Sequence, residues 1–180
     1  MTKHDTYLNY LWILTKENIK FKEAVRRQNM RLTDHMNQDW ICLNINKNDK
    51  KSAIKQLFDK IDKNIQFDKN KSKIIDAIFS REELMSTGVG SGIALPHAKT
   101  NYCSDFYIGI GISPQGIDYD SIDGEKVKII CLLIGPENEP NKHIKFLSLI
   151  SKLLNQNTIR QQLITAQNSE EVFNIFLENE

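Results

Sequence analysis

The almost uninterrupted apolar run Val127–Ile134 constrains the fold of this chain more than any other feature of the sequence. The run has the length of a β-strand and is far shorter than the ~20 residues that span a bilayer. A strand that is apolar on both faces is buried on both faces, as in the middle of a sheet. We therefore expect Val127–Ile134 to form a central strand.

Further strand and helix patterns lie on both sides of this run. Residues 41–45 and 106–113 predict two more strands, and glycines at 109 and 111 permit the close approach of a neighbouring element before Pro114 ends the second strand. Strands that alternate with helices predict an α/β sandwich around one sheet. The expected helices are those with apolar stripes at 53–61 and 74–79, one beginning at Pro140, one over 158–166, and a last one capped by residues 168–171 and ending near Leu177.

The N-terminal segment has a different pattern. Residues 5–35 predict one long helix with side chains three and four apart in a heptad seam, which favours either a dimer interface or an amphipathic helix docked on the body. Residues 33–40 are polar and predict a linker. The expected organisation is therefore an N-terminal helical extension, 1–36, followed by one domain, 37–180.

The composition excludes several classes of protein. A formal net charge of +1 over 180 residues argues against a nucleic-acid binder. The three cysteines are widely spaced without a CxxC pair, which predicts neither a disulfide framework nor a zinc site and favours a reducing cytoplasm. The N-terminal apolar patch is interrupted by Asn9 and lacks a cleavage site, so no signal peptide is expected.

The stretch Arg81–Lys99 combines a helix end, a glycine loop, a short apolar run and a histidine. Three of the eight glycines fall at 88, 90 and 92, and Pro96 ends the apolar run that follows them. This order predicts a flexible loop that leads into a short buried strand. We expect the strand to bring His97 to the edge of the sheet.

The residue types around this stretch suit phosphoryl chemistry. The ring of a histidine is largely neutral near pH 7, so His97 can act as a nucleophile. Arg81 can contact a phosphate through two hydrogen bonds, and His143 lies at the start of the helix that begins at Pro140, where free N–H groups attract anions. Each residue also has a plainer interpretation, as a surface histidine, a helix-surface ion pair or a helix cap, and spacing alone does not bring the three together.

Other chemistries lack their signatures. No lysine follows the last glycine of the loop, as a phosphate-binding P-loop would require, and the loop precedes a strand, whereas a dinucleotide fingerprint follows one. His97 and His143 with Cys103 have no short-range ligand spacing for a metal. We expect neither a metal nor a cofactor.

The extended motif carries a resemblance to a known family. Ser80–Glu83 together with Ser86–His97 resembles the signature of the fructose/mannitol-type enzyme IIA domain of bacterial phosphotransferase systems. The similarity continues through residues 120–124, 127–136, 143–150 and 166–171, and covers roughly residues 38 to 180. Within the family the chain is most similar to the nitrogen-type, PtsN-like regulatory branch.

The resemblance implies a mixed β-sheet flanked by helices on both faces, and a specific activity. His97 would accept a phosphoryl group from the phosphohistidine of an HPr-like carrier, which is itself charged from phosphoenolpyruvate through an enzyme I. Arg81 and His143 would lie beside His97 and hold the phosphoryl group, and Ser86 and Thr87 would help to bind the phosphate. The output would be regulatory, through a target protein.

Two alternatives remain open. The chain could be a sugar-specific enzyme IIA that passes phosphate to an enzyme IIB for fructose- or mannitol-class uptake, or an interaction module that is never phosphorylated. The absence of a fused enzyme IIB, IIC or HPr-like segment suits a regulator. The role of residues 1–36, including the expected homodimer, is not inherited from the family.

Overall fold

A computed structural model describes residues 30–180, and Leu32–Glu180 form one compact unit. The unit is built on a six-stranded mixed sheet, which confirms the predicted fold class. The strands are β1 (Met36–Cys42), β2 (Gly88–Gly90), β3 (Ile93–Ala94), β4 (His97–Thr100), β5 (Tyr107–Ile117) and β6 (Val127–Pro136).

Strand β6 is central, as its apolar sequence predicts. It pairs in antiparallel fashion with β5 on one side and in parallel with both β3 and β4 on the other. Strand β1 extends the sheet beyond β5, and β2 extends it beyond β3. Because β4 has no partner other than β6, His97, its first residue, lies at an edge of the sheet opposite Leu133.

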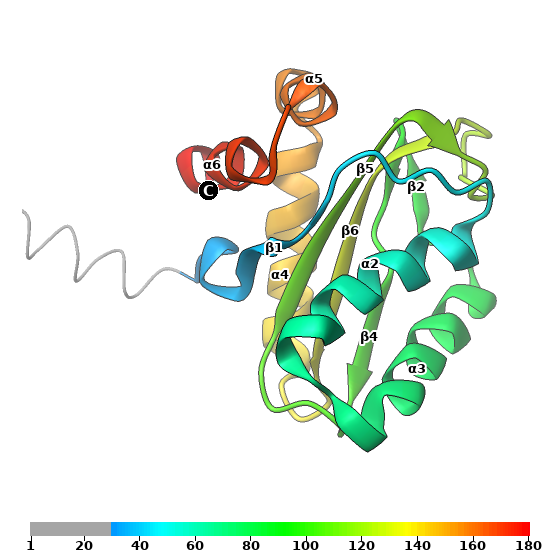
Figure 1. The fold of residues 1–180 in the computed structure, drawn as a ribbon, viewed down its shortest axis with the longest axis vertical. Helices are drawn as coiled ribbons and strands as arrows, with labels where there is room; N and C mark the ends of the chain where they lie inside the picture. The colour runs from blue at the N-terminus through cyan, green and yellow to red at the C-terminus, as the bar shows by residue number, and fades with distance from the viewer. Residues whose placement is uncertain (1–29) are drawn as a thin grey trace, which may run out of the picture. The chain divides into compact units, whose positions relative to one another are not determined.

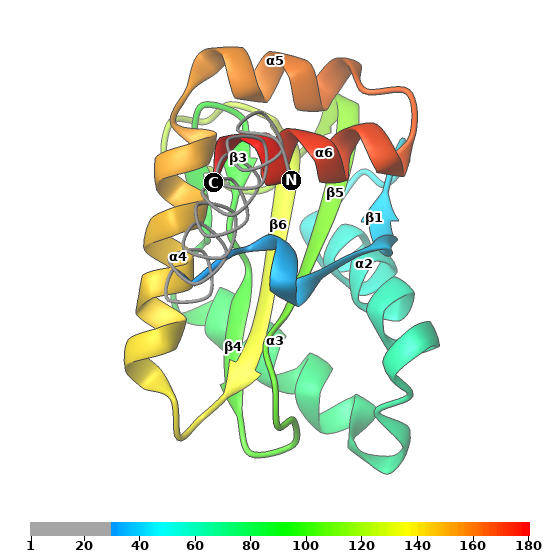
Figure 2. The ribbon, with the colours of Figure 1, turned by 90° about the vertical axis from the view of Figure 1, so that its left-hand side faces the viewer.

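Helices cover both faces of the sheet (Figure 1). Helices α2 and α3 lie on one face, and α4, α5 and α6 lie on the other, as the turned view also shows (Figure 2). The helices, with two short 3-10 segments, are η1 (Thr33–His35), α2 (Lys50–Ile65), η2 (Asp68–Asn70), α3 (Lys71–Leu84), α4 (Pro140–Leu154), α5 (Asn157–Thr165) and α6 (Ser169–Asn179).

Local signals in the sequence account for where the helices begin. Asp49 caps α2 by accepting a hydrogen bond from the Ser52 N–H at 2.9 Å. Pro140 is the first residue of α4, where a missing N–H costs nothing. Asn168 caps α6 by accepting from the Glu171 N–H at 2.9 Å. The sequence predicted the starts at Pro140 and Asn168, which are confirmed, and for α2 it left the cap open between Asp49 and Ser52, of which the structure has Asp49.

The strand glycines meet the close neighbours expected of them. A Cβ added at Gly109 would lie 2.9 Å from Cδ1 of Ile61, and one at Gly111 would lie 2.5 Å from Cδ1 of Ile45. Real Cβ atoms do not approach other atoms so closely, so glycine lets these side chains pack flat on β5. The close approach predicted for β5 is confirmed.

Two local predictions were wrong. Residues 33–40 are not a polar linker: Thr33–His35 form η1 and β1 begins at Met36, with Leu32 and Trp40 buried. The strand expected at 41–45 is confirmed only for Ile41 and Cys42, because β1 runs from Met36 to Cys42. Strand β5 does not end at Pro114 but continues to Ile117 after an irregularity in its pairing with β6, which lets the proline sit in the strand without breaking the sheet.

The helix predicted for residues 5–35 lies, up to residue 29, outside the described residues. At the junction, the side-chain carboxylate of Glu180 accepts hydrogen bonds from the backbone N–H groups of Leu32, at 2.6 Å, and Thr33, at 3.1 Å. Over residues 30–180 no helix combines the length and hydropathy needed to cross a membrane.

Candidate functional site

Four of the five predicted site residues, Arg81, Ser86, Thr87 and His97, line one pocket of about 580 Å³ on the compact unit, and His143 is not among its lining residues. His97 enters it from the first position of β4, and Arg81 reaches it from the last turn of α3. Ser86 and Thr87, in the loop between α3 and β2, line the same pocket. Residues far apart in the sequence are thus brought together by the parallel pairing of β3 and β4 with β6 and by the packing of α3 on β4.

Hydrogen bonds to the His97 ring define which of its nitrogens carries the proton. Arg81 Nε lies 3.2 Å from His97 Nε2, and His97 Nδ1 lies 2.8 Å from the carbonyl oxygen of Leu95. A guanidinium only donates, so Nε2 presents its lone pair, and a carbonyl only accepts, so Nδ1 carries the hydrogen. The ring is therefore held with Nε2 as its free nucleophilic atom.

The surroundings of His97 keep its ring neutral. Burial lowers the pKa of His97, while the hydrogen bond to the Leu95 carbonyl acts in the opposite direction and the positive charge of Arg81 lowers the pKa further. A neutral imidazole has a lone pair to share, whereas an imidazolium has none. The site thus favours the form of His97 that can accept an electrophile near pH 7.

His143 lies beside His97, as the sequence interpretation required. Their ring centroids are 5.6 Å apart, and His143 packs against the Phe106 ring at 6.1 Å. His143 is only 2% exposed, and within residues 30–180 neither of its ring nitrogens has a hydrogen-bond partner. Burial lowers the pKa of His143 to about 4, with nearby His97 and Lys99 adding to the effect. An unpartnered buried imidazole costs free energy unless a ligand can use it.

The hydroxyl groups of Ser86 and Thr87 are engaged within the protein. Ser86 Oγ donates to the Tyr119 carbonyl at 3.0 Å, and the Thr87 hydroxyl donates to the carboxylate of Glu82. Both residues line the pocket, yet neither hydroxyl is free to donate to an anion in this arrangement. A phosphate-binding role for them stays a prediction.

A carboxylate beneath the pocket was missed from the sequence. Glu82 is 3% exposed, and Lys50 Nζ lies 3.4 Å from it and 2.9 Å from Asp120. The sequence feature that could have identified Glu82 as buried is its spacing along the helix. The buried face of α3 carries a residue every four positions, at Ile74, Ile78 and Glu82. A carboxylate on an apolar stripe is rarely buried unless it is paired.

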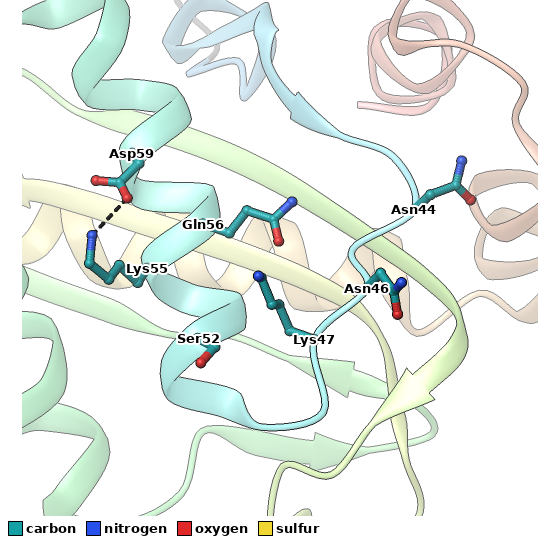
Figure 3. A pocket seen from close by; sticks show the side chains of 7 residues that line it. All are labelled: Asn44, Asn46, Lys47, Ser52, Lys55, Gln56 and Asp59. Carbon is teal, nitrogen blue, oxygen red and sulfur yellow. Dashed lines mark hydrogen bonds and ion pairs between the residues drawn. The ribbon is translucent and has the colours of Figure 1, made fainter.

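A second, polar pocket shares no lining residue with the His97 pocket (Figure 3). It lies along the first half of α2 and the segment that precedes this helix, and Lys55 and Asp59 form an ion pair of 2.8 Å at its border. It contains no histidine or cysteine. Within residues 30–180 no group of His, Cys, Asp and Glu side chains is arranged to hold a metal ion.

The fold and the histidine pocket agree with what the chain resembles. Residues 34–179 match the model of the family described as "Phosphoenolpyruvate-dependent sugar phosphotransferase system, EIIA 2". The match covers most of the chain, so the chain belongs to this family. It is a phosphoryl carrier of the EIIA type.

Two kinds of relative are similar to the chain. It is 30% identical over 150 residues to a protein of Klebsiella oxytoca named "Nitrogen regulatory protein", covering 83% of this chain and 91% of that one. It is 34% identical over 146 residues to the "PTS system fructose-specific EIIABC component" of Bacillus subtilis, covering 81% of this chain. The match spans 23% of that fructose-specific protein.

Solved structures show the same fold. The nitrogen regulatory protein IIA-Ntr of Neisseria meningitidis superposes with a TM-score of 0.75 at 26% identity, covering 81% of this chain and 98% of that one. The mannitol IIA of Escherichia coli superposes with a TM-score of 0.63 at 18% identity, over 78% and 97% of the two chains. The nitrogen-type and mannitol-type proteins thus share the fold of this chain.

Proposed function

We propose that His97 carries the phosphoryl group, accepting it on Nε2 from the phosphohistidine of an HPr-like carrier. The observation that supports this most directly is the pair of hydrogen bonds that leave the lone pair on Nε2 and the proton on Nδ1. Arg81 and His143 are then the residues that hold the phosphoryl group. Arg81 already reaches Nε2, and the free nitrogens of His143 lie beside the ring.

The transfer needs no metal and no proton movement at His97. The Nε2 lone pair forms a bond to phosphorus, while the P–N bond to the ring-protonated donor histidine breaks and its electron pair returns to the donor nitrogen. His97 keeps its Nδ1–H and becomes a phosphoimidazolium, whose positive charge faces the Leu95 carbonyl. Arg81 Nε leaves Nε2 at the same moment and donates to a phosphoryl oxygen, where charge is concentrated in the loose transition state.

An apolar rim around the pocket offers a surface for the donor. Met85, Val89 and Ile122 line the pocket and are 69%, 53% and 86% exposed. Large apolar side chains that cluster at an exposed site are typical of surfaces that bind other proteins. We propose that the carrier docks on this rim and thereby brings its phosphohistidine to His97.

The test uses enzyme I, an HPr-type carrier and radiolabelled phosphoenolpyruvate. We expect label on the wild type and none on His97→Ala, while His4→Gln, a matched control for histidine loss, is labelled as the wild type. Arg81→Ala should be labelled about tenfold more slowly, because a charge-assisted hydrogen bond is worth roughly 1.5–3 kcal/mol. An unlabelled wild type beside a labelled carrier would contradict the proposal, and so would label on His97→Ala.

We propose a regulatory output, because the chain matches nearly the whole length of a nitrogen regulatory protein. The second candidate is delivery of phosphate to an enzyme IIB, favoured by the similarity to the fructose-specific protein. Adding candidate enzyme IIB proteins to the labelled chain separates the two, since only the second predicts transfer of label. Cys42, Cys103 and Cys131 are free thiols, which supports a cytoplasmic location for either role.

The division into an N-terminal extension and a phosphocarrier domain, predicted as 1–36 and 37–180, also stays a proposal, although the compact unit already begins at Leu32. A homodimer formed through the predicted N-terminal helix stays a proposal as well. The heptad spacing of residues 5–35 is the support for the dimer. Light scattering of the full chain measures its mass in solution directly. A mass of twice 20.8 kDa would support the dimer, and a mass of one chain would reject it.

A further inference from the structure

Glu82 is a buried carboxylate that the proposed transfer does not itself use. It lies one residue after Arg81 in the last turn of α3, and its neighbour Glu83 is exposed. Removing a carboxylate from water is costly unless charge and hydrogen bonds compensate. Both oxygens of Glu82 accept from the Thr87 N–H, at 3.1 and 3.2 Å, one also accepts from the Thr87 hydroxyl, and Lys50 lies 3.4 Å from the other.

From Thr87 a series of hydrogen bonds leads to the His97 ring. The Thr87 carbonyl accepts from the Leu95 N–H at 3.0 Å, and the Leu95 carbonyl accepts from His97 Nδ1–H at 2.8 Å. Thr87 and Leu95 thus connect the Glu82 carboxylate to Nδ1 of His97, the ring nitrogen that does not act as the nucleophile. The Leu95 carbonyl holds the His97 ring in place. Leu95 is in turn held by its hydrogen bond to Thr87, and Thr87 is held by Glu82.

Helix α3 therefore supports the site through two side chains, those of Arg81 and Glu82. Arg81 reaches Nε2 of His97 directly, and Glu82 reaches Nδ1 through Thr87 and Leu95. Lys50 pairs with Asp120 as well as with Glu82, which ties the same carboxylate to the loop that follows β5. Displacing Thr87 would shift the Leu95 carbonyl and with it the ring.

We infer that Glu82 is a positioning residue for phosphoryl transfer: its carboxylate holds Thr87, and through Leu95 it fixes His97 as the Nδ1–H tautomer with Nε2 aimed into the pocket. This inference rests on the proposed function of His97. Burial lowers the pKa of His97, and the negative charge of Glu82 acts against that effect. The same charge stabilises the positive ring that forms when Nε2 is phosphorylated.

An amide cannot replace the carboxylate here. A carboxylate accepts on both oxygens, whereas the amide of glutamine accepts on one atom and donates from the other. In Glu82→Gln the NH₂ group would face either a donor of Thr87 or the ammonium of Lys50, so one contact becomes repulsive. The substitution keeps the size of the side chain and removes the function assigned to it.

The test compares Glu82→Gln with Glu83→Gln, which removes the same charge from the next residue of the helix without touching the pocket. The first measurement is the ¹⁵N chemical shifts of the His97 ring in the unphosphorylated protein, which report the tautomer. We expect the wild type and Glu83→Gln to show one Nδ1–H tautomer and Glu82→Gln to show a mixture. This readout does not depend on phosphorylation.

The second measurement is the rate of labelling by the phosphorylated carrier, with thermal unfolding measured alongside it. We expect Glu82→Gln to be slowed about tenfold at saturating carrier, since small misplacements of reacting atoms have large effects on rate. Glu83→Gln should be labelled at the wild-type rate. Should Glu82→Gln fail to fold, Thr87→Val, which removes only the hydroxyl donor, is expected to give a smaller shift toward the mixture and a slowing of about threefold.

Each outcome decides the inference. A folded Glu82→Gln with an unchanged tautomer and an unchanged rate overturns the positioning role, as does an unfolded Glu82→Gln combined with a Thr87→Val that matches the wild type in both measurements. If the wild type itself is not labelled, the proposed function of His97 fails, while the tautomer comparison still decides whether Glu82 orients the ring.

Discussion

His97 and His143 are neighbours in space but differ in what holds them. Both ring nitrogens of His97 are hydrogen-bonded, one to Arg81 and one to the Leu95 carbonyl. Those of His143 have no partner, and its ring is fixed by packing against Phe106 and by the burial of α4. This difference is what the proposed roles require, with His97 as the acceptor of the phosphoryl group and His143 as a residue that holds it.

The pH dependence of stability tests the burial of His143. Its pKa is about 4 in the folded chain and near 6.5 when unfolded, so the unfolded chain binds more protons between these values. The stability due to the neutral ring is therefore complete above pH 6.5 and is lost as the pH falls toward 4. At pH 5 the loss should be on the order of 1–2 kcal/mol.

Denaturant unfolding of the wild type and His143→Gln at pH 7 and pH 5 measures this effect. Glutamine does not titrate, so the variant should lose less stability between the two pH values, whatever its stability at pH 7. His97 is present in both proteins and its contribution cancels in the comparison. An equal loss in both would show that His143 does not have the lowered pKa.

At the scale of elements, the pocket is lined by the end of α3, the loop into β2 and β2 itself, the start of β4 with the residues before it, the loop after β5, and α4. The glycine loop is held from outside, because the Gly88 carbonyl accepts from the Ile122 N–H at 3.0 Å and Asp123 accepts from the Ser91 N–H at 2.7 Å. The residues of the glycine loop are consecutive in the sequence, whereas Ile122 and Asp123, which hold the loop, belong to the loop after β5. The loop is thus shaped by tertiary contacts as much as by its glycines.

The packing of β6 against its neighbours can be tested at Gly135. A Cβ there would overlap the Phe106 ring, 2.5 Å from Cδ1, and would lie 3.1 Å from His143 Nδ1. Gly135→Ala should therefore destabilise the protein by about 2–3 kcal/mol, because a rigid ring has to move in a packed interior.

Gly109→Ala is the matched control on the neighbouring strand. Its Cβ would meet the far end of the Ile61 side chain, which can shift, so a loss of about 1 kcal/mol is expected. Urea unfolding measures both. Equal losses of stability in the two variants would show that the Phe106 ring can move aside as easily as the end of the Ile61 side chain.

The elements themselves were largely predictable, for local reasons. The cap at Asn168, the proline that begins α4 and the run Val127–Ile134 act within a few residues, so the sequence predicted them. The first part of β1 was missed because the exposed polar residues 37–39 separate buried Met36 from the buried residues 40–42, whereas the strand expected at 41–45 overlaps the end of β1. Glu82 was missed because a charged side chain was assigned to the surface, although its position is on the buried stripe of α3.

At the scale of the whole chain, the two ends of the compact unit are held together. The Glu180 carboxylate accepts from Leu32 and Thr33, and Leu32 and Met36 are buried. The unit therefore begins near residue 32, a few residues before the boundary at 36 that the sequence predicted.

Two truncations test this boundary. Deleting residues 2–29 should leave the stability of the compact unit within about 0.5 kcal/mol of the wild type, because nothing from the unit is removed. Deleting residues 2–36 should cost about 2–4 kcal/mol, since it removes buried Leu32 and Met36 and leaves Glu180 without these partners. Urea unfolding gives both values, and equal stability of the two truncations would contradict the assigned start.

The sequence by itself determined most of the elements, the family and the choice of His97 as the candidate phosphoryl acceptor. The strand and helix patterns are local, and the motif from Ser80 to His97 is continuous along the chain. Only the tertiary structure decided that Arg81 and His143 lie beside the His97 ring, that Glu82 is connected to it through Thr87 and Leu95, and which ring nitrogen carries the proton. These depend on hydrogen bonds between residues 2 to 16 positions apart and on the contact between the His97 and His143 rings, whose geometry spacing along a chain does not specify.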